Sequence, residues 1–126
     1  MLGNNDVCAC LAVKDMDAAT KFYKETLGLE VADESPGGTF FKSGSGGVFV
    51  YPSQFAGSNK ATAAAWQVDD VEAAVEELKG KGVAFEQYDD MPEVERDGDI
   101  HKMGDLKAAW FRDPDGNILN IVNQMG

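Results

Sequence analysis

The apolar positions along the chain follow two different periods, which predict strands and helices in a fixed order. Near the N-terminus, Ala9, Leu11 and Val13 alternate with their neighbours, which is the spacing of a strand with one buried face. Residues 16–27 instead place apolar side chains three and four apart, as on one side of an amphipathic helix. Asp15 stands directly before this stretch, where a carboxylate can accept the first backbone N–H groups of a helix. This part is therefore predicted to form a strand followed by a helix.

The same pattern occurs a second time further along the chain. The stretch 13–19 matches 68–74 in its order of apolar and acidic residues, and Asp70 takes the place of the helix-capping Asp15. Two β-type runs around a glycine-bearing turn also occur twice, at 40–50 and at 110–120. Each copy therefore reads as a βαβββ module. Module one lies at about residues 6–52, the polar linker at 53–62 and module two at about 62–124.

Length and charge exclude several classes of function. The 126 residues are enough for one domain but not for an additional functional module. A net charge of −11 repels phosphate backbones and anionic lipids, so we expect no nucleic-acid and no membrane partner. The N-terminus has neither a basic nor an apolar leader segment, and no apolar run approaches the roughly 18 residues of a membrane span. We expect a cytoplasmic protein.

The two cysteines, Cys8 and Cys10, are two residues apart in an apolar stretch, which on a strand places both thiols on one face. They do not form a disulfide framework of the kind found in small secreted domains. We expect buried, reduced thiols because no electropositive surroundings that would activate them are visible. A redox pair or a soft-metal site remains the alternative.

Three stretches of the chain resemble one known family. Residues 11–29, with Phe22-Tyr23 and Leu27-Gly28-Leu29, are similar to the opening strand and helix of the vicinal-oxygen-chelate superfamily, which has the glyoxalase and bleomycin-resistance fold. Residues 66–71 resemble the start of its second module, and 111–117 resemble its last hairpin. The resemblance implies an α+β fold in which two βαβββ modules form a curved mixed sheet around a concave cavity. It also implies a homodimer, which would cover open sheet edges.

The positions of the family's metal ligands can be transferred to this sequence residue by residue. Metal-dependent members take one ligand from the first and one from the last strand of each module, and the resemblance places these at Cys8 and Val50, and at Ala63 and Asn120. Val50 and Ala63 have no donor atom, and Asn120 offers only a neutral amide oxygen. We therefore expect no metal and no other cofactor, and the family's metal-dependent activities do not carry over.

Residues 89–105 are an insertion that has no counterpart in module one. The stretch contains seven acidic residues and the only histidine, His101. Its length is typical of a loop that acts as a lid. We expect it to be mobile, with His101 either in solvent or, as a lid residue, at the mouth of the cavity.

The remaining candidates for the concave face are small, apolar or aromatic side chains. The expected ligand-binding residues are Cys8, Cys10, Phe40, Val48, Val50, Ala63, Gln67, Trp110, Phe111 and Asn120. No nucleophile motif surrounds His101, so no catalytic residue is assigned. The set predicts a metal-independent protein that binds an apolar or aromatic small molecule. Two alternatives stay open: a lyase, isomerase or dioxygenase-like enzyme that uses non-standard residues or an unrecognised metal, and a structural or interaction protein without a ligand.

Overall fold

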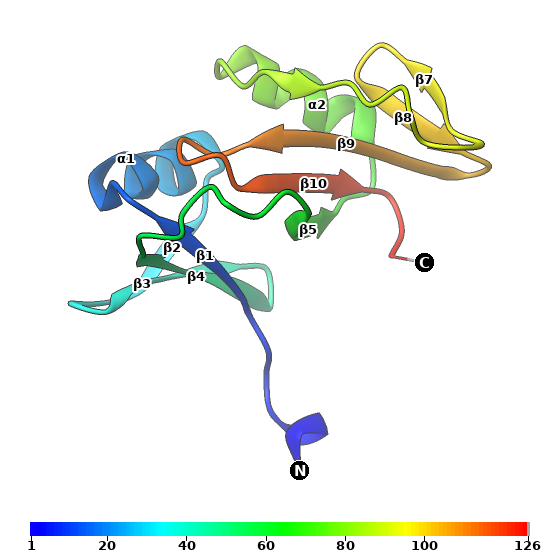
Figure 1. Cartoon of the computed structure of the whole chain (residues 1–126). Coiled ribbons are helices and arrows are strands. Elements are labelled where there is room, and N and C mark those ends of the chain that lie inside the picture. The colour runs from blue at the N-terminus through cyan, green and yellow to red at the C-terminus, as the bar shows by residue number, and fades with distance from the viewer. Residues whose placement is uncertain (126) are drawn as a thin grey trace. The chain divides into compact units, whose positions relative to one another are not determined.

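The computed structural model describes residues 1–125, and it has the α+β fold that the repeat predicts (Figure 1). The chain forms two compact units. Unit 1 contains residues 1–63 together with 113–117, and unit 2 contains 64–112 and 118–125. The turn 113–117 thus belongs to unit 1, although it was expected within module two. None of the helices in residues 1–125 has the length and apolar character needed to cross a bilayer.

Unit 1 has one four-stranded sheet with a helix on one side. Its elements are η1 (Leu2–Asn4), β1 (Ala9–Val13), α1 (Met16–Lys21), η2 (Phe22–Thr26), β2 (Glu30–Ser35), β3 (Gly38–Ser43) and β4 (Gly46–Pro52). The strand order is β1-β4-β3-β2, in which β1 and β4 are parallel and the other pairs are antiparallel. The parallel pair is possible because α1 lies on the connection between β1 and the later strands.

Capping and turn residues set the limits of the helical segment in unit 1. The Asp15 carboxylate accepts the backbone N–H of Ala18 at 3.0 Å, which confirms the predicted N-cap. α1 continues into η2, a π-helical turn in which Leu27 N–H donates to the Phe22 carbonyl at 3.0 Å. Gly28 ends the segment with φ of 75°, a backbone conformation that favours glycine.

The register of the first sheet sorts its side chains onto two faces. One face packs under the helical segment, where the Tyr23 and Phe41 ring centroids are 5.8 Å apart. Leu11 and Val50 are Cα partners on that face, and both are buried. The other face, which we call the helix-free face, carries Cys10 beside its Cα partner Phe49. Alternation along each strand therefore separates Cys10 from Val50.

The turn 113–117 is fixed to unit 1 by a buried polar cluster. The Asp113 carboxylate accepts the Tyr23 hydroxyl at 2.6 Å and the Asn117 side-chain amide at 2.8 Å. The same amide donates to the Ala12 carbonyl at 2.8 Å, and the Asp115 carboxylate accepts the Lys14 backbone N–H at 2.9 Å. The other Asp113 oxygen accepts the Asp115 and Asn117 backbone N–H groups, both at 2.9 Å, so the turn combines internal hydrogen bonds with bonds to residues 12–23. One buried Asp115 oxygen has no hydrogen-bond partner among residues 1–125.

Unit 2 repeats the strand and helix order and adds a hairpin. Its elements are β5 (Thr62–Gln67), which starts in unit 1, α2 (Val71–Gly80), β6 (Phe85–Glu86), β7 (Glu95–Asp97), β8 (Ile100–Met103), β9 (Leu106–Arg112) and β10 (Ile118–Val122). The order is β5-β10-β9-β8-β7, with β6 paired to β9. Figure 1 shows β9 and β10 side by side in orange and red. Asp70 caps α2 by accepting the Ala73 N–H at 3.0 Å, as predicted.

The second sheet also has a face under its helix and a helix-free face. Lys107 on β9 reaches Glu72 on α2, with Nζ and Oε1 2.8 Å apart. By alternation Phe111 shares the face of Lys107, and it packs on Phe85 with 5.5 Å between ring centroids. Trp110 therefore lies on the helix-free face, together with its Cα partner Asn120.

Candidate functional site

Three aromatic rings from different segments meet on the helix-free face of the second sheet. Trp110 lies on β9, His101 on the neighbouring β8, and Tyr88 on the segment that follows β6. The His101 and Trp110 ring centroids are 4.9 Å apart in an edge-to-face arrangement, and Tyr88 approaches them at 5.8 Å and 5.5 Å. Edge-to-face contacts of this kind are favourable beyond the burial of area alone. We call these three residues the aromatic cluster.

His101 is buried in the centre of this cluster. Its Nε2 accepts the Tyr88 backbone N–H at 2.9 Å, so this nitrogen carries no proton. Its Nδ1 is buried and has no hydrogen-bond partner among residues 1–125. The residue is 2% exposed. The expectation of a loop histidine in solvent is wrong, because β8 pairs with β9 and turns the side chain onto Trp110.

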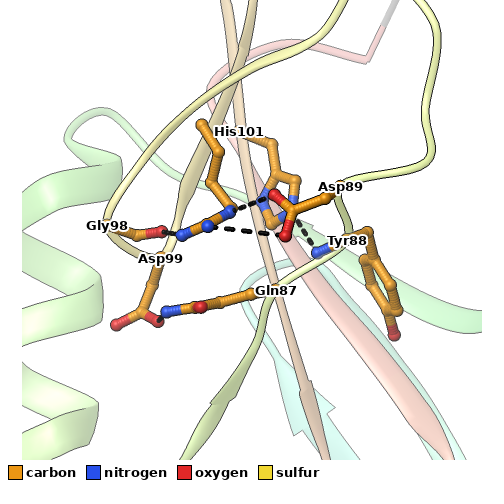
Figure 2. A network of polar contacts seen from close by, with 7 residues as sticks. Gln87, Tyr88, Asp89, Gly98, Asp99 and His101 are labelled. Atoms are coloured by element: carbon orange, nitrogen blue, oxygen red, sulfur yellow. Dashed lines mark hydrogen bonds and ion pairs between the residues drawn. The ribbon is translucent and has the colours of Figure 1, made fainter.

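Polar contacts join residues of the insertion that was expected to be a mobile loop acting as a lid. The Asp89 carboxylate binds the guanidinium of Arg96, whose Nε is 2.7 Å from Oδ1. A second nitrogen of Arg96 donates to the Gly98 carbonyl at 2.8 Å, and Gln87 donates to Asp99 at 3.1 Å (Figure 2). Hydrogen bonding to Arg96 holds the pKa of Asp89 below its usual range. The insertion is therefore a β7–β8 hairpin, and the structure corrects that part of the prediction.

A second ion pair joins this hairpin to the helix of the same unit. Asp99 binds Lys79 of α2, with Nζ and Oδ2 2.5 Å apart. The hydrogen bond from Lys79 lowers the pKa of Asp99, so its carboxylate stays charged near neutral pH. The strand pairs of β8 and these side chains together place His101 against Trp110.

The edge of the aromatic cluster is polar. Arg112 and Glu86 form an ion pair and lie, by strand alternation, on the same face as Trp110. Burial, and after it the charge of Glu86, raise the pKa of the Tyr88 phenol, so it remains protonated at neutral pH. Asn120 is buried, and its side-chain amide donates to the Ala109 carbonyl at 3.1 Å. The face thus combines ring surfaces with a small number of hydrogen-bonding groups.

The structure brings only part of the predicted ligand-binding set together. In the second sheet Trp110 and Asn120 share the helix-free face, whereas Phe111 lies under α2. In the first sheet the helix-free face holds Cys8, Cys10 and Phe40, whereas Val48 and Val50 lie under the helical segment. Ala63 is half-buried and Gln67 is exposed, both on β5.

The four positions transferred from the family's metal ligands do not provide a metal-binding set. Val50 is on the opposite face of the sheet from Cys10, and the residue beside Cys10 on β4 is Phe49, which also lacks a donor. Within residues 1–125 no group of three or more His, Cys, Asp or Glu side chains is placed to hold a metal ion. Divalent ions such as zinc need three or four ligands of these types. The residues present do not fit the family's metal.

Comparison with known proteins decides the family. The family model described as Glyoxalase/Bleomycin resistance protein/Dioxygenase superfamily matches residues 6–121. The chain belongs to this superfamily. A glyoxalase family protein from Enterococcus faecalis superposes with a TM-score of 0.73 at 22% identity, over 97% of this chain and 99% of that one. Lactoylglutathione lyase from Agrobacterium tumefaciens gives 0.67 at 21% identity, over 94% and 92%. Structural likeness at these identities shows the glyoxalase-type fold alone.

Reasoning from sequence missed two groups of residues in this superfamily member. Tyr88 was not a candidate, because it follows the two-residue strand β6 and no periodic pattern marks it. Phe49 and Tyr51, which stack on the helix-free face of the first sheet with centroids 6.1 Å apart, were also missed. The available signal was the alternation of Val48 and Val50 with these rings along β4. The two valines were expected on the ligand-binding face, but they lie under the helical segment, and the rings lie on the helix-free face.

Proposed function

We propose that the chain binds an aromatic small molecule, without a metal, on the helix-free face of the second sheet. The observation that supports this most is the aromatic cluster. Trp110 and Tyr88 are each only half-buried, so their rings retain surface on which a planar ligand can stack. Polar groups at the edge of the cluster, such as Arg112, can orient such a ligand.

Charge and the donor set favour a particular kind of ligand. A chain with a net charge of −11 attracts neutral or cationic molecules more readily than anions. The transferred ligand positions offer no set of donors that fits a divalent ion, so the proposed ligand would bind without coordinating a metal. A neutral aromatic compound with one hydroxyl group, such as 1-naphthol, is therefore a suitable probe.

Fluorescence titration of 1-naphthol tests this proposal. In a Trp66→Phe background, Trp110 is the only tryptophan, and ligand stacking should quench its emission with saturation. Tyr88→Leu should weaken binding about tenfold, because it removes one stacking surface. Phe49→Leu is the matched control, since it removes a ring from the first sheet, and it should leave the affinity unchanged.

Native mass spectrometry provides the test of metal independence. We expect no stoichiometric zinc, iron, manganese or nickel after gentle purification, and 1-naphthol titrations unaffected by a chelator. Quenching that is lost with the chelator, or that Phe49→Leu abolishes while Tyr88→Leu does not, would contradict the proposal.

We also propose a homodimer, supported by the composition of the sheet edges. Two edge strands are charged: β2 carries Glu30, Asp33 and Glu34, and β7 contains Glu95, Arg96 and Asp97. β1 and β5 end their sheets as well, but neither contains a charged residue. Edges without charge are the ones suited to association with another copy of the chain.

A further inference from the structure

Cys8 and Cys10 form a pair of thiols on the helix-free face of the first sheet. Cys10 is the second residue of β1 and Cys8 directly precedes the strand, so their side chains project to the same side. Both residues are exposed and neither is in a disulfide, in contrast to the expected buried thiols. Desolvation, then the charge of Cys8 and a hydrogen bond between the two thiols, raise the pKa of Cys10. The two-residue spacing at the start of β1 thus places two accessible thiols side by side on one side of the strand.

The strand backbone favours an ion between these sulfurs over a direct bond. Residues two apart on a strand are separated by roughly 6.6 Å, and their Cβ atoms stay similarly far apart. A disulfide needs Cβ atoms about 3.8 Å apart, which would bend β1 away from its partner β4. Two sulfurs that share a metal ion are instead separated by about 4.6 Å, twice a bond of about 2.3 Å. The two side chains can reach this separation by leaning toward each other through rotation about their Cα–Cβ bonds, without bending the strand.

The number and type of donors select the class of ion. No third His, Cys, Asp or Glu joins the pair within the described part of the chain. Zinc requires four ligands in structural sites and three in catalytic ones, so two thiols do not satisfy it. Soft monovalent ions with a filled d shell, such as Cu(I) and Ag(I), accept two thiolates in a linear arrangement, and thiolates select soft ions.

We propose that Cys8 and Cys10 of one chain together bind a single soft monovalent cation of the Cu(I) and Ag(I) class. Two S–H bonds break and two sulfur–metal bonds form, the two protons pass to solvent, and no atom changes its oxidation state. The site is on a different sheet from the aromatic cluster and is independent of the proposed aromatic ligand.

Titration with Ag(I) tests the pair directly, since this ion needs no reductant. Calorimetry of the reduced protein in buffers of different ionisation enthalpy should give one ion bound and about two protons released per chain, because both thiols must lose a proton. Cys8→Ser and Cys10→Ser should each lower the affinity at least about 100-fold and reduce the release to one proton. Zinc should bind at least about 100-fold more weakly than Ag(I) to the wild-type chain.

Three results would overturn this inference. One is a single-serine variant that binds Ag(I) as tightly as the wild type, which would mean that a lone thiol is sufficient. Another is half an ion per chain, which would mean that the ion bridges two chains. The last is complete oxidation of the two thiols, seen as a loss of two hydrogens per chain with oxidised glutathione as the oxidant, which would show that the strand permits a disulfide.

The serine changes are at exposed positions, and unchanged near-ultraviolet circular dichroism would verify folding. A negative result leaves the 1-naphthol titration unaffected.

Discussion

At the scale of single residues, the buried pair of Tyr23 and Asp113 depends on the proton of the phenol. Desolvation, and then the negative charge of Asp113, raise the pKa of Tyr23 far above its usual range, so the hydroxyl remains a donor. Tyr23→Phe removes that donor and leaves a buried carboxylate oxygen with one bond fewer. We expect the free energy of unfolding in urea to fall by about 1–3 kcal/mol, with the slope against urea unchanged. Tyr51→Phe, which also loses a phenol hydroxyl, is the control and should change the free energy of unfolding by less than about 0.5 kcal/mol.

The same residue gives a pH dependence with a definite sign. An unfolded tyrosine loses its proton near pH 10, whereas folded Tyr23 keeps it to higher pH. The contribution of Tyr23 to stability is therefore fully present below about pH 10 and decreases as the pH rises further. The difference in unfolding free energy between the wild type and Tyr23→Phe should shrink between pH 8 and pH 11. A constant difference across this range would contradict the explanation.

At the scale of secondary-structure elements, the β7–β8 hairpin owes its order to Arg96. This side chain binds Asp89, which precedes the hairpin, and the Gly98 carbonyl in the hairpin turn, and Arg96→Gln removes the charged contact. Hydrogen exchange should become several-fold faster at residues 87–98 and change little in β10, because the opening is local. Arg112→Gln removes a comparable ion pair on β9 and should not affect the hairpin. Equal exchange in Arg96→Gln and the wild type would show that strand pairing alone orders this segment.

The success and failure of sequence reasoning also differ from element to element. The two helix starts were predictable because an N-cap aspartate followed by helical spacing is a local signal, and Asp15 and Asp70 both act as caps. The hairpin in the insertion was not predictable, because Arg96, Asp97 and their neighbours are charged and do not alternate with apolar residues. Its side-chain contacts, such as that of Arg96 with Asp89, join residues outside any local pattern. Edge strands depend less on an apolar pattern than central ones.

The candidate site was predictable only where a strand had a clear partner. The repeat marked the hairpin that holds Trp110 and Asn120, but it left open which of Trp110 and Phe111 shares the face of Asn120, and the register with β10 shows that it is Trp110. Val50 was expected beside the cysteines, because alternation alone does not say which of two apolar faces lies under the helix. The register of β4 with β1 pairs Val50 with Leu11 and so places it on the face opposite Cys10. The face of His101 depends on pairing within the insertion, which no sequence period indicates.

At the scale of the whole molecule, the proposed homodimer makes a prediction about β5. Ala65 is exposed on this uncharged edge strand, so Ala65→Lys places a charge where association requires an apolar surface. Sedimentation at micromolar concentration should show a dimer for the wild type and a monomer for Ala65→Lys. Glu34→Lys, on the charged edge β2, is the control and should remain a dimer. A monomeric wild type at these concentrations would rule out the dimer.

The turn 113–117 has a consequence for how the chain unfolds. Its flanking strands β9 and β10 belong to unit 2, while the turn itself is bound to Tyr23, Lys14 and the Ala12 carbonyl in unit 1. We expect that melting of unit 2 would pull this turn out and leave the buried Tyr23 hydroxyl without its partner, and that loss of unit 1 would release the tip of the β9–β10 hairpin. We therefore expect the stabilities of the two units to depend on each other. A separately expressed first half, residues 1–63, would lack Asp113 and Asn117, which are buried in unit 1, and we expect it to be less stable than the same unit in the full chain.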